Sequence, residues 1–316
     1  MKNYIEEVAL SGIEGQPLYL TPAKGLKIAK AYLLWLMKKT GKRPDKITIA
    51  VGQDPRLSGR LLKVACFNAL VPYGVNCLDC NLSATPAMEA LTVGELSVEP
   101  YNLKSDGAIM ITSSTGEPHM NGFKFFNKEG ILKEEDYAEI LTTSEAEEDY
   151  VDLGELSGMD NFRIQYGKRI YNTTEIDLLD LYSKYLCDGI KAEFNSEENY
   201  ELPLLGKKIA VDASNGTGGF IATKVFARLG AVIQDSQYLE PDGNFFNHPP
   251  DTENVAAKHS IAMKTLAKGC DLGLLFNSDL SNFSAFDKLG FEIPVLASNI
   301  KIDKWLISNL KSLLTD

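Results

Sequence analysis

Three polar loops contain the residues of this sequence whose types and spacing could do chemistry. Residues 112–117 read TSSTGE and precede Lys124, residues 213–219 read ASNGTGG, and residues 277–282 read NSDLSN. A serine becomes a nucleophile only when a base or its surroundings activate it, and a glycine-rich loop can hold phosphate on its backbone N–H groups. The first loop is a candidate for a reactive serine and the second for an anion site. A polar turn is the alternative for each, and the second loop lacks the Lys-Ser/Thr of a Walker motif.

Each of these loops follows an apolar run that is typical of a buried strand. The runs are GAIMI, KIAVD and LGLLF, in the order of the three loops. Near-continuous apolar strands that alternate with helices indicate mainly parallel sheets covered on both faces. In such sheets ligands bind at the carboxyl ends of the strands, which is where all three loops are expected to lie.

The alternation of strands and helices occurs twice, on either side of an acidic, weakly periodic stretch from Thr142 to about Asn172. The first half predicts strands over 46–52, 75–80 and 106–112, with helices over 59–73 and from Thr85, which is a possible N-cap. The second half predicts helices over 175–187, 220–230 and 254–269, with strands over 207–213, 231–236 and 270–276. Two α/β domains in tandem are therefore expected.

Composition and charge exclude several classes of function. The 316 residues carry a net charge of −11, from 43 acidic and 32 basic residues, and nucleic-acid binding depends on clustered Lys and Arg. No apolar run approaches the ~18 residues of a membrane span, and the amino terminus lacks the order of a secretory signal. We expect a cytoplasmic protein that binds neither nucleic acid nor membrane.

The five cysteines are odd in number and scattered along the chain, which argues against a disulfide framework. Cys77 and Cys80 form a single C-x-x-C on a strand-like run. A zinc ribbon needs a second such pair, and a redox motif begins a helix, so structural thiols are favoured.

Five motifs, in order along the chain, resemble those of the α-D-phosphohexomutase superfamily, the phosphoglucomutases and phosphomannomutases. They are VGQDPRLSG (51–59), TSSTGE with NGFK (112–124), VDASNGTGG (211–219), PDGNFFNHPPDTEN (241–254) and CDLGLLFNSDLSNFSAFD (270–287). The family patterns are V-G-x-D-x-R-x-S-G, T-A-S-H-N-P with N-G-F-K, V-D-x-x-N-G-x-G, P-D-G-x-F-P-N-H-x-P-x-P-E and A-D-L-G-x-x-F-D-x-D-x-D-R. One motif alone would be weak, but five in order make the resemblance specific.

The resemblance implies a fold and a reaction. Family members usually have four domains, and this chain is expected to carry the first two, at residues 1–165 and 166–316, with a C-terminal helix after the second. The implied architecture is α/β, with two tandem three-layer α/β/α domains and mixed, mainly parallel sheets. The implied reaction moves a phosphoryl group between two oxygens of a hexose phosphate through a phosphoserine.

The resemblance also assigns the candidate site residues. Ser114 takes the position of the phosphoserine, and Lys124 keeps its place after it. Arg56 and Lys124 are the candidates for binding phosphate, although a strand-end loop stabilised by an Asp54–Arg56 turn is at least as good an explanation for the arginine. The family's Mg²⁺ would be held by Asp279 together with Ser114.

Three departures from the family patterns predict impaired catalysis. After Ser114, the family's His, Asn and Pro are replaced by Thr115, Gly116 and Glu117. In the metal loop, two of three aspartates and the following arginine are replaced, by Asn277, Ser281 and Asn282. The amino-terminal motif of the family, which carries an arginine, is replaced by a region containing Glu6 and Glu7. One carboxylate without the serine phosphate is a poor site for Mg²⁺, so we expect weak binding or none.

These observations leave several functions open. The chain could be an impaired phosphohexomutase, a non-catalytic protein that binds a hexose phosphate or a partner, or a truncated remnant without a function of its own. Self-association or a protein partner is expected, because a scaffold without the third and fourth domains would expose apolar surface.

Overall fold

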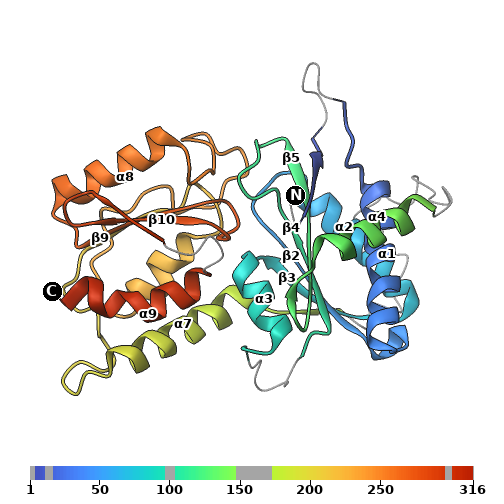
Figure 1. The fold of residues 1–316 in the computed structure, drawn as a ribbon, viewed down its shortest axis with the longest axis horizontal. Helices are drawn as coiled ribbons and strands as arrows, with labels where there is room; N and C mark the ends of the chain where they lie inside the picture. Colours follow the sequence, from blue (N-terminus) through green and yellow to red (C-terminus); the bar gives the residue numbers. More distant parts are fainter. Residues whose placement is uncertain (1–3, 11–16, 97–103, 147–172, 296–300, 316) are drawn as a thin grey trace. The chain divides into compact units, whose positions relative to one another are not determined.

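The chain folds into two compact units (Figure 1). The computed structural model describes residues 4–10, 17–96, 104–146, 173–295 and 301–315. The first unit consists of Met1–Ser83, Met88–Ser113 and His119–Asp177, and the second consists of Ala84–Ala87, Ser114–Pro118 and Leu178–Asp316. The second unit thus includes two short segments from the first half of the sequence. The predicted boundary between residues 165 and 166 lies outside the described residues.

The first unit is built on a mixed sheet with the strand order β1-β5-β4-β2-β3-β7, in which β6 also pairs with β5. The strands are β1 (Ile5–Val8), β2 (Thr48–Gln53), β3 (Asn76–Leu82), β4 (Gly107–Ile111), β5 (Met120–Asn127), β6 (Gly130–Ile131) and β7 (Thr173–Glu175). The ladders among β4, β2, β3 and β7 are parallel, and those that join β1, β4 and β6 to β5 are antiparallel. Every residue of β4 is buried, as its continuous apolar run predicts.

Helices cover both faces of this first sheet: in Figure 1, α1, α2 and α4 lie on one side and α3 on the other. The helices are α1 (Pro22–Thr40), α2 (Gly59–Leu70), α3 (Thr85–Val93) and α4 (Glu134–Ala146), with short 3-10 helices at Pro44–Lys46 and Val71–Tyr73. Thr21 caps α1 by accepting the N–H of Lys24, and Gly41 ends the helix in the left-handed conformation. Trp35 of α1 is buried in the core.

The second unit has a four-stranded sheet in the order β11-β10-β9-β8. Its strands are β8 (Ile209–Asp212), β9 (Leu272–Phe276), β10 (Phe283–Asp287) and β11 (Glu292–Ile293). The sheet is mixed, but only the β8–β9 ladder is parallel, because the chain reaches β10 and β11 through short turns instead of crossover helices. The strand predicted over 231–236 is replaced by isolated parallel bridges to the β8 region at Val232 and Gln237.

The helices of the second unit are α7 (Leu178–Phe194), α8 (Val255–Lys268) and α9 (Ile302–Thr315), with a π-helix at Ile221–Phe226. The π-helix lies within residues 220–230, where the sequence predicts a helix. Helix α9 packs on α7 so closely that a Cβ at Gly189 would lie 2.6 Å from the Cδ1 of Ile307. Trp305 of α9 is buried and packs against the ring of Phe283, with 5.1 Å between ring centroids.

All five cysteines are free and buried. Burial raises the pKa of the Cys77 thiol to about 12, with a smaller contribution from the negative charge of Asp79. Thiols in such surroundings are unreactive, which agrees with the structural role predicted for them. In the part of the chain that the structure describes, no helix has the length and apolar character needed to cross a membrane.

Candidate functional site

Ser114 lies in the loop between β4 and β5 and belongs to the second unit. It is 3% exposed and has a φ of +52°, a left-handed conformation that serine rarely adopts. Its Oγ donates a hydrogen bond to Oδ2 of Asp279 over 3.0 Å and lies 3.4 Å from Oγ of Ser281. The structure therefore brings together the predicted phosphoserine position and the one aspartate retained in the metal loop.

Asp279 is fully buried just after β9, where its carboxylate accepts hydrogen bonds at both oxygens. Oδ2 accepts the hydroxyl of Thr85 at 2.7 Å as well as that of Ser114. Oδ1 accepts the side-chain N–H of Asn277 at 2.9 Å and the hydroxyl of Ser281 at 2.7 Å. We call these five side chains the Asp279 cluster. It surrounds a buried carboxylate with neutral donors.

The donors of this cluster do not fit the Mg²⁺ that the family resemblance implies. A Mg²⁺ site presents oxygen lone pairs to the ion, whereas the amide of Asn277 presents N–H groups to Asp279 and Ser281. The orientation of that amide follows from its oxygen, which accepts the backbone N–H of Asn282 at 3.0 Å. Among the described residues, no three His, Cys, Asp or Glu side chains gather as a potential metal site. The expected weakness of Mg²⁺ binding stays a prediction.

Arg56, a candidate for binding phosphate, is buried in the first unit after β2. Its Nε donates to Oδ2 of Asp54 over 3.1 Å, and its Nη1 donates to the carbonyl of Met120 over 3.3 Å. The same Asp54 oxygen accepts the hydroxyl of Thr112 at 2.8 Å. This geometry fits the Asp54–Arg56 turn. The phosphate role of Arg56 stays a prediction.

Lys124, the other candidate for binding phosphate, lies on β5 and is 4% exposed. Its Nζ is 5.5 Å from the ring centroid of Tyr4, within the range of a cation–π interaction. On the neighbouring strand β1, Glu6 accepts a hydrogen bond from the hydroxyl of Ser113. A carboxylate therefore contacts the serine next to Ser114, in the region where the family motif carries an arginine.

The glycine-rich loop after β8 is closely packed against the backbone of the second unit. An added Cβ would lie 2.6 Å from Cα of Ser278 at Gly216 and 2.0 Å from the carbonyl oxygen of Leu239 at Gly219. The backbone N–H of Thr217 donates to the carbonyl of Ser278 over 2.7 Å. These close contacts favour the interpretation of this loop as a tight turn between strand and helix, and not as a site that holds phosphate.

A second buried carboxylate, Asp212 at the end of β8, pairs with His248. Nε2 of His248 is 3.1 Å from both carboxylate oxygens, and Nδ1 is 2.8 Å from the carbonyl of Pro249. Burial favours the neutral imidazole, but the hydrogen bonds and charge of Asp212 outweigh it and raise the pKa of His248. With acceptors at both ring nitrogens, His248 holds its loop on β8 and has no nitrogen left to act as a base.

Sequence reasoning missed two contacts of the site. The sequence marks Thr85 as a possible N-cap, but in the structure it is the first residue of α3 and its hydroxyl donates to Asp279. The sequence shows Glu6 as a negative charge in the amino-terminal region, and it does not predict the contact of Glu6 with Ser113. The partners are 194 and 107 residues apart in sequence, so no local pattern reports them.

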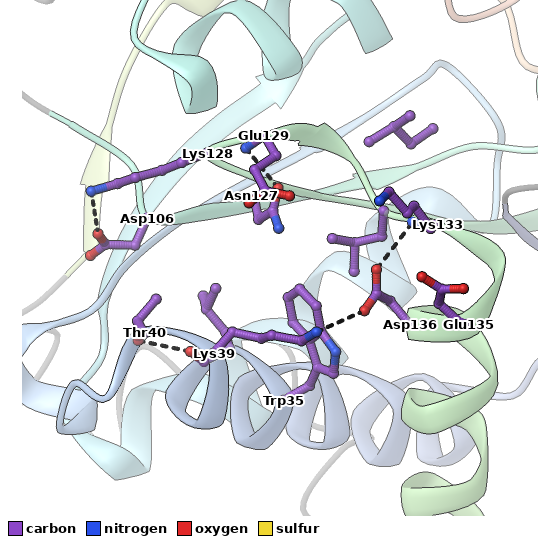
Figure 2. Close-up of a pocket in the computed structure, with 13 residues that line it drawn as sticks. Trp35, Lys39, Thr40, Asp106, Asn127, Lys128, Glu129, Lys133, Glu135 and Asp136 are labelled. Atoms are coloured by element: carbon purple, nitrogen blue, oxygen red, sulfur yellow. Dashed lines mark hydrogen bonds and ion pairs between the residues drawn. The ribbon is translucent and has the colours of Figure 1, made fainter.

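A pocket of about 300 Å³ lies elsewhere in the first unit, between α1 and the β5–β6 turn (Figure 2). Nζ of Lys39 lies 5.3 Å from the ring centroid of Trp35 and 3.3 Å from a carboxylate oxygen of Asp136. Nζ of Lys128 lies 3.3 Å from the carboxylate of Asp106. Because Lys39 and Lys128 are paired with these carboxylates and none of the predicted site residues lines the pocket, we assign it no role in the site.

The fold and the site define a protein of two α/β/α units whose polar loops follow the carboxyl ends of β4, β8 and β9. Two family models match the chain: phosphoglucomutase/phosphomannomutase alpha/beta/alpha domain I over residues 8–151, and domain II over residues 183–290. The chain therefore belongs to the α-D-phosphohexomutase superfamily and contains its two amino-terminal domains.

Curated relatives agree with this assignment. A phosphoglucosamine mutase from Nautilia profundicola is 30% identical over 277 residues, which are 86% of this chain and 53% of the relative. A phosphoglucosamine mutase from Pediococcus pentosaceus is 27% identical over 274 residues, again 86% of this chain and 53% of the relative. The chain thus spans about half the length of these relatives.

Solved structures support the fold. A phosphoglucomutase/phosphomannomutase family protein from Burkholderia thailandensis aligns with a TM-score of 0.66 and 23% identity, covering 92% of this chain and 55% of that one. A putative phosphomannomutase from Thermus thermophilus aligns with a TM-score of 0.63 and 17% identity, covering 86% and 55%.

Proposed function

We propose that this chain is a phosphohexomutase-family protein whose phosphoryl transfer through Ser114 is impaired. The observation that carries the proposal is the 3.0 Å hydrogen bond from Ser114 Oγ to the buried carboxylate of Asp279. The hydroxyl that would have to carry the phosphoryl group instead satisfies a negative charge. The other donors of the Asp279 cluster are neutral.

Phosphorylation of Ser114 would reverse this interaction. The phosphate group adds a charge of about −1.5 to −2 near neutral pH, and the carboxylate of Asp279 is 3.0 Å from the oxygen that would carry it. Like charges at this distance repel strongly when both are buried. Without a cation between them, we expect phosphoserine at this position to form slowly and to accumulate little.

Turnover assays test this proposal. The curated relatives are named phosphoglucosamine mutases, so glucosamine 6-phosphate is the first substrate to try, followed by glucose and mannose 6-phosphates. Each is incubated with the matching hexose 1,6-bisphosphate, with and without Mg²⁺, and intact-mass analysis follows the protein. We expect no phosphate adduct and a turnover at the level of Ser114→Ala. An adduct at Ser114, with turnover that the alanine variant loses, would overturn the proposal.

Self-association is a second candidate function, favoured by exposed apolar side chains in the second unit. They lie on α8 and on the turn between β10 and β11, and they are Met263 (48% exposed), Leu266 (45%), Leu289 (57%) and Phe291 (68%). We call these four residues the α8 patch. The turn contacts α8, since a Cβ at Gly290 would lie 2.9 Å from the carbonyl oxygen of Ala262 and 3.7 Å from Cβ of Leu266. Exposed apolar side chains that lie on neighbouring elements are typical of interaction sites.

A second copy of this chain is the partner that we propose for the α8 patch, and light scattering after size exclusion tests it. The average molar mass of the wild type is expected to increase with protein concentration. The Phe291→Ser variant is expected to stay monomeric. A wild type that stays monomeric at all concentrations contradicts self-association and leaves another protein as the partner. If the chain shows no turnover, no binding of sugar phosphates and no association, the remaining alternative is a remnant without a function of its own.

A further inference from the structure

We infer that the Asp279 cluster replaces a divalent cation as the element that holds the serine loop, so that this part of the fold is stable without Mg²⁺. The inference goes beyond the proposed loss of phosphoryl transfer, because it concerns what keeps the loop in place. Its readouts are stability and cation binding, so its outcome is independent of any turnover.

The cluster joins three segments of the second unit that are far apart in sequence. Thr85 comes from the segment Ala84–Ala87, Ser114 from the segment Ser114–Pro118, and Asp279 from the loop after β9. Side chains make only part of the connection. The backbone N–H of Thr85 donates to the carbonyl of Asp279 over 2.9 Å, and the hydroxyl of Ser278 donates to the carbonyl of Ser114.

Because the cluster is buried, its hydrogen bonds contribute strongly to the stability of the loop. Asp279, Asn277 and Ser278 are fully buried, and Ser114 is 3% exposed. A buried carboxylate without donors or a counter-ion carries a large desolvation cost. Here hydroxyl and amide donors lie at 2.7–3.0 Å from its two oxygens, which offsets that cost without a metal.

Asn277 is the residue that makes the loop independent of a cation. Its oxygen accepts the N–H of Asn282, while its nitrogen donates to Asp279 and to Ser281, so one amide satisfies both sides of the loop. An aspartate at this position would keep the acceptor and lose the donor. It would also place a second buried carboxylate within hydrogen-bond distance of the first, and such pairs require a proton or a cation.

Ser281 also makes the loop independent of a cation. Its hydroxyl donates to Oδ1 of Asp279 over 2.7 Å, and its backbone N–H approaches the same oxygen at 3.2 Å. An aspartate here would add a third carboxylate to the cluster. The double variant Asn277→Asp/Ser281→Asp therefore converts donors into oxygen ligands of the type that hard cations prefer.

Thermal unfolding of the full chain tests the inference directly. The thermal unfolding midpoint of the wild-type protein is measured in EDTA and again in 10 mM MgCl₂. The two midpoint temperatures are expected to agree within about 1 °C. A protein with a tight site, at a hundred times its dissociation constant, would instead gain about 5–10 °C. A wild-type midpoint that rises by several degrees with Mg²⁺, or sub-millimolar Mg²⁺ binding in calorimetry, would overturn the inference.

The double variant and a matched control complete the test. In EDTA, Asn277→Asp/Ser281→Asp is expected to unfold several degrees below the wild type, and Mg²⁺ is expected to restore most of that loss. Asn282→Asp adds a carboxylate to the same loop at an exposed position. The thermal unfolding midpoint of this variant is expected to be the same with and without Mg²⁺. A double variant as stable in EDTA as the wild type would show that the donors of the cluster do not hold the loop. If the double variant fails to fold, the single variant Asn277→Asp takes its place, and the wild-type comparison decides independently.

Discussion

At the scale of single residues, the carboxylates of the two loops accept hydrogen bonds from neutral side chains. Asp279 accepts hydroxyl and amide donors, and Glu6 accepts the hydroxyl of Ser113. The cationic side chains predicted to meet phosphate are themselves buried, with Arg56 paired to Asp54 and Lys124 beside the ring of Tyr4. Each of these contacts uses a polar group that an anionic substrate would need.

The hydroxyl of Thr85 contributes measurably to stability. Thr85→Val preserves the shape of the side chain and removes the donor to Oδ2 of Asp279. Leaving a buried carboxylate oxygen short of a donor costs about 1–3 kcal/mol, which should appear as a lower free energy of unfolding in urea.

Thr92→Val is the matched control for this prediction. Thr92 is on the same helix and is also buried, but its hydroxyl donates to the carbonyl of Met88 within α3. That carbonyl belongs to the helical ladder, so the loss should be smaller than for Thr85→Val. Equal losses for the two variants would contradict a special role of the contact with Asp279.

The ion pair of His248 and Asp212 makes stability depend on pH. Because the folded pKa of His248 is raised, the pair stabilises the folded state fully below the unfolded pKa of about 6.5. That contribution is lost as the pH rises through the folded pKa. Urea unfolding at a series of pH values should therefore give a free energy that falls above pH ~6.5.

His248→Gln is the comparison for the pH dependence. Glutamine can still donate to the carboxylate of Asp212, but it does not titrate. The difference between wild type and variant should shrink as the pH rises. A difference that stays constant over this range would mean that the pair is not charged in the folded protein.

At the scale of elements, the sequence predicts strands best where they are buried on both faces. The runs that became β2, β4, β8 and β9 were predicted, because continuous apolar strands between helices are a local signal. The antiparallel strands β5 and β10 were not predicted. Their pairing depends on segments that are distant in sequence or on the geometry of a hairpin. The change from α-helix to π-helix at Ile221–Phe226 also has no local signal in the spacing of apolar residues.

The turn after β8 depends on its glycines through packing. Gly219→Ala would place a Cβ 2.0 Å from the carbonyl oxygen of Leu239, a contact that only a shift of the backbone can relieve. Overpacking of this kind costs about 1–3 kcal/mol or more, and the thermal midpoint should fall accordingly.

Gly59→Ala serves as the control for this substitution. At Gly59, the first residue of α2, the nearest atoms to an added Cβ belong to the flexible side chain of Gln53, at 3.3 Å. Alanine is also the better helix former. We expect this variant to be close to the wild type, and a Gly219→Ala protein of equal stability would contradict the close packing of the turn.

At the scale of the whole molecule, the sequence predicted the family and the two α/β/α domains, and it identified Ser114 and Asp279 as the residues to compare. It could not predict that they contact each other, nor that Thr85 joins them, because these contacts arise only when the chain folds. The division into units has the same origin: Ala84–Ala87 and Ser114–Pro118 belong to the second unit by contact and to the first half by sequence.

The net charge of −11 makes a prediction for association through the α8 patch. Two copies repel each other over a Debye length of about 10 Å at 0.1 M salt, and this length falls to about 3 Å at 1 M. Apolar contacts do not weaken in this way. If Met263, Leu266, Leu289 and Phe291 drive association, the average mass in sedimentation velocity should therefore increase between low and high salt.

Two variants separate this mechanism from charge pairing. Phe291→Ser removes the most exposed member of the α8 patch and should keep the protein monomeric at high salt. Leu205→Ser changes a side chain that is 58% exposed near Gly230 of the same unit, outside the patch, and should associate like the wild type. An average mass that falls as salt is added would mean that ion pairs hold the copies together, because only charge pairs are weakened by screening.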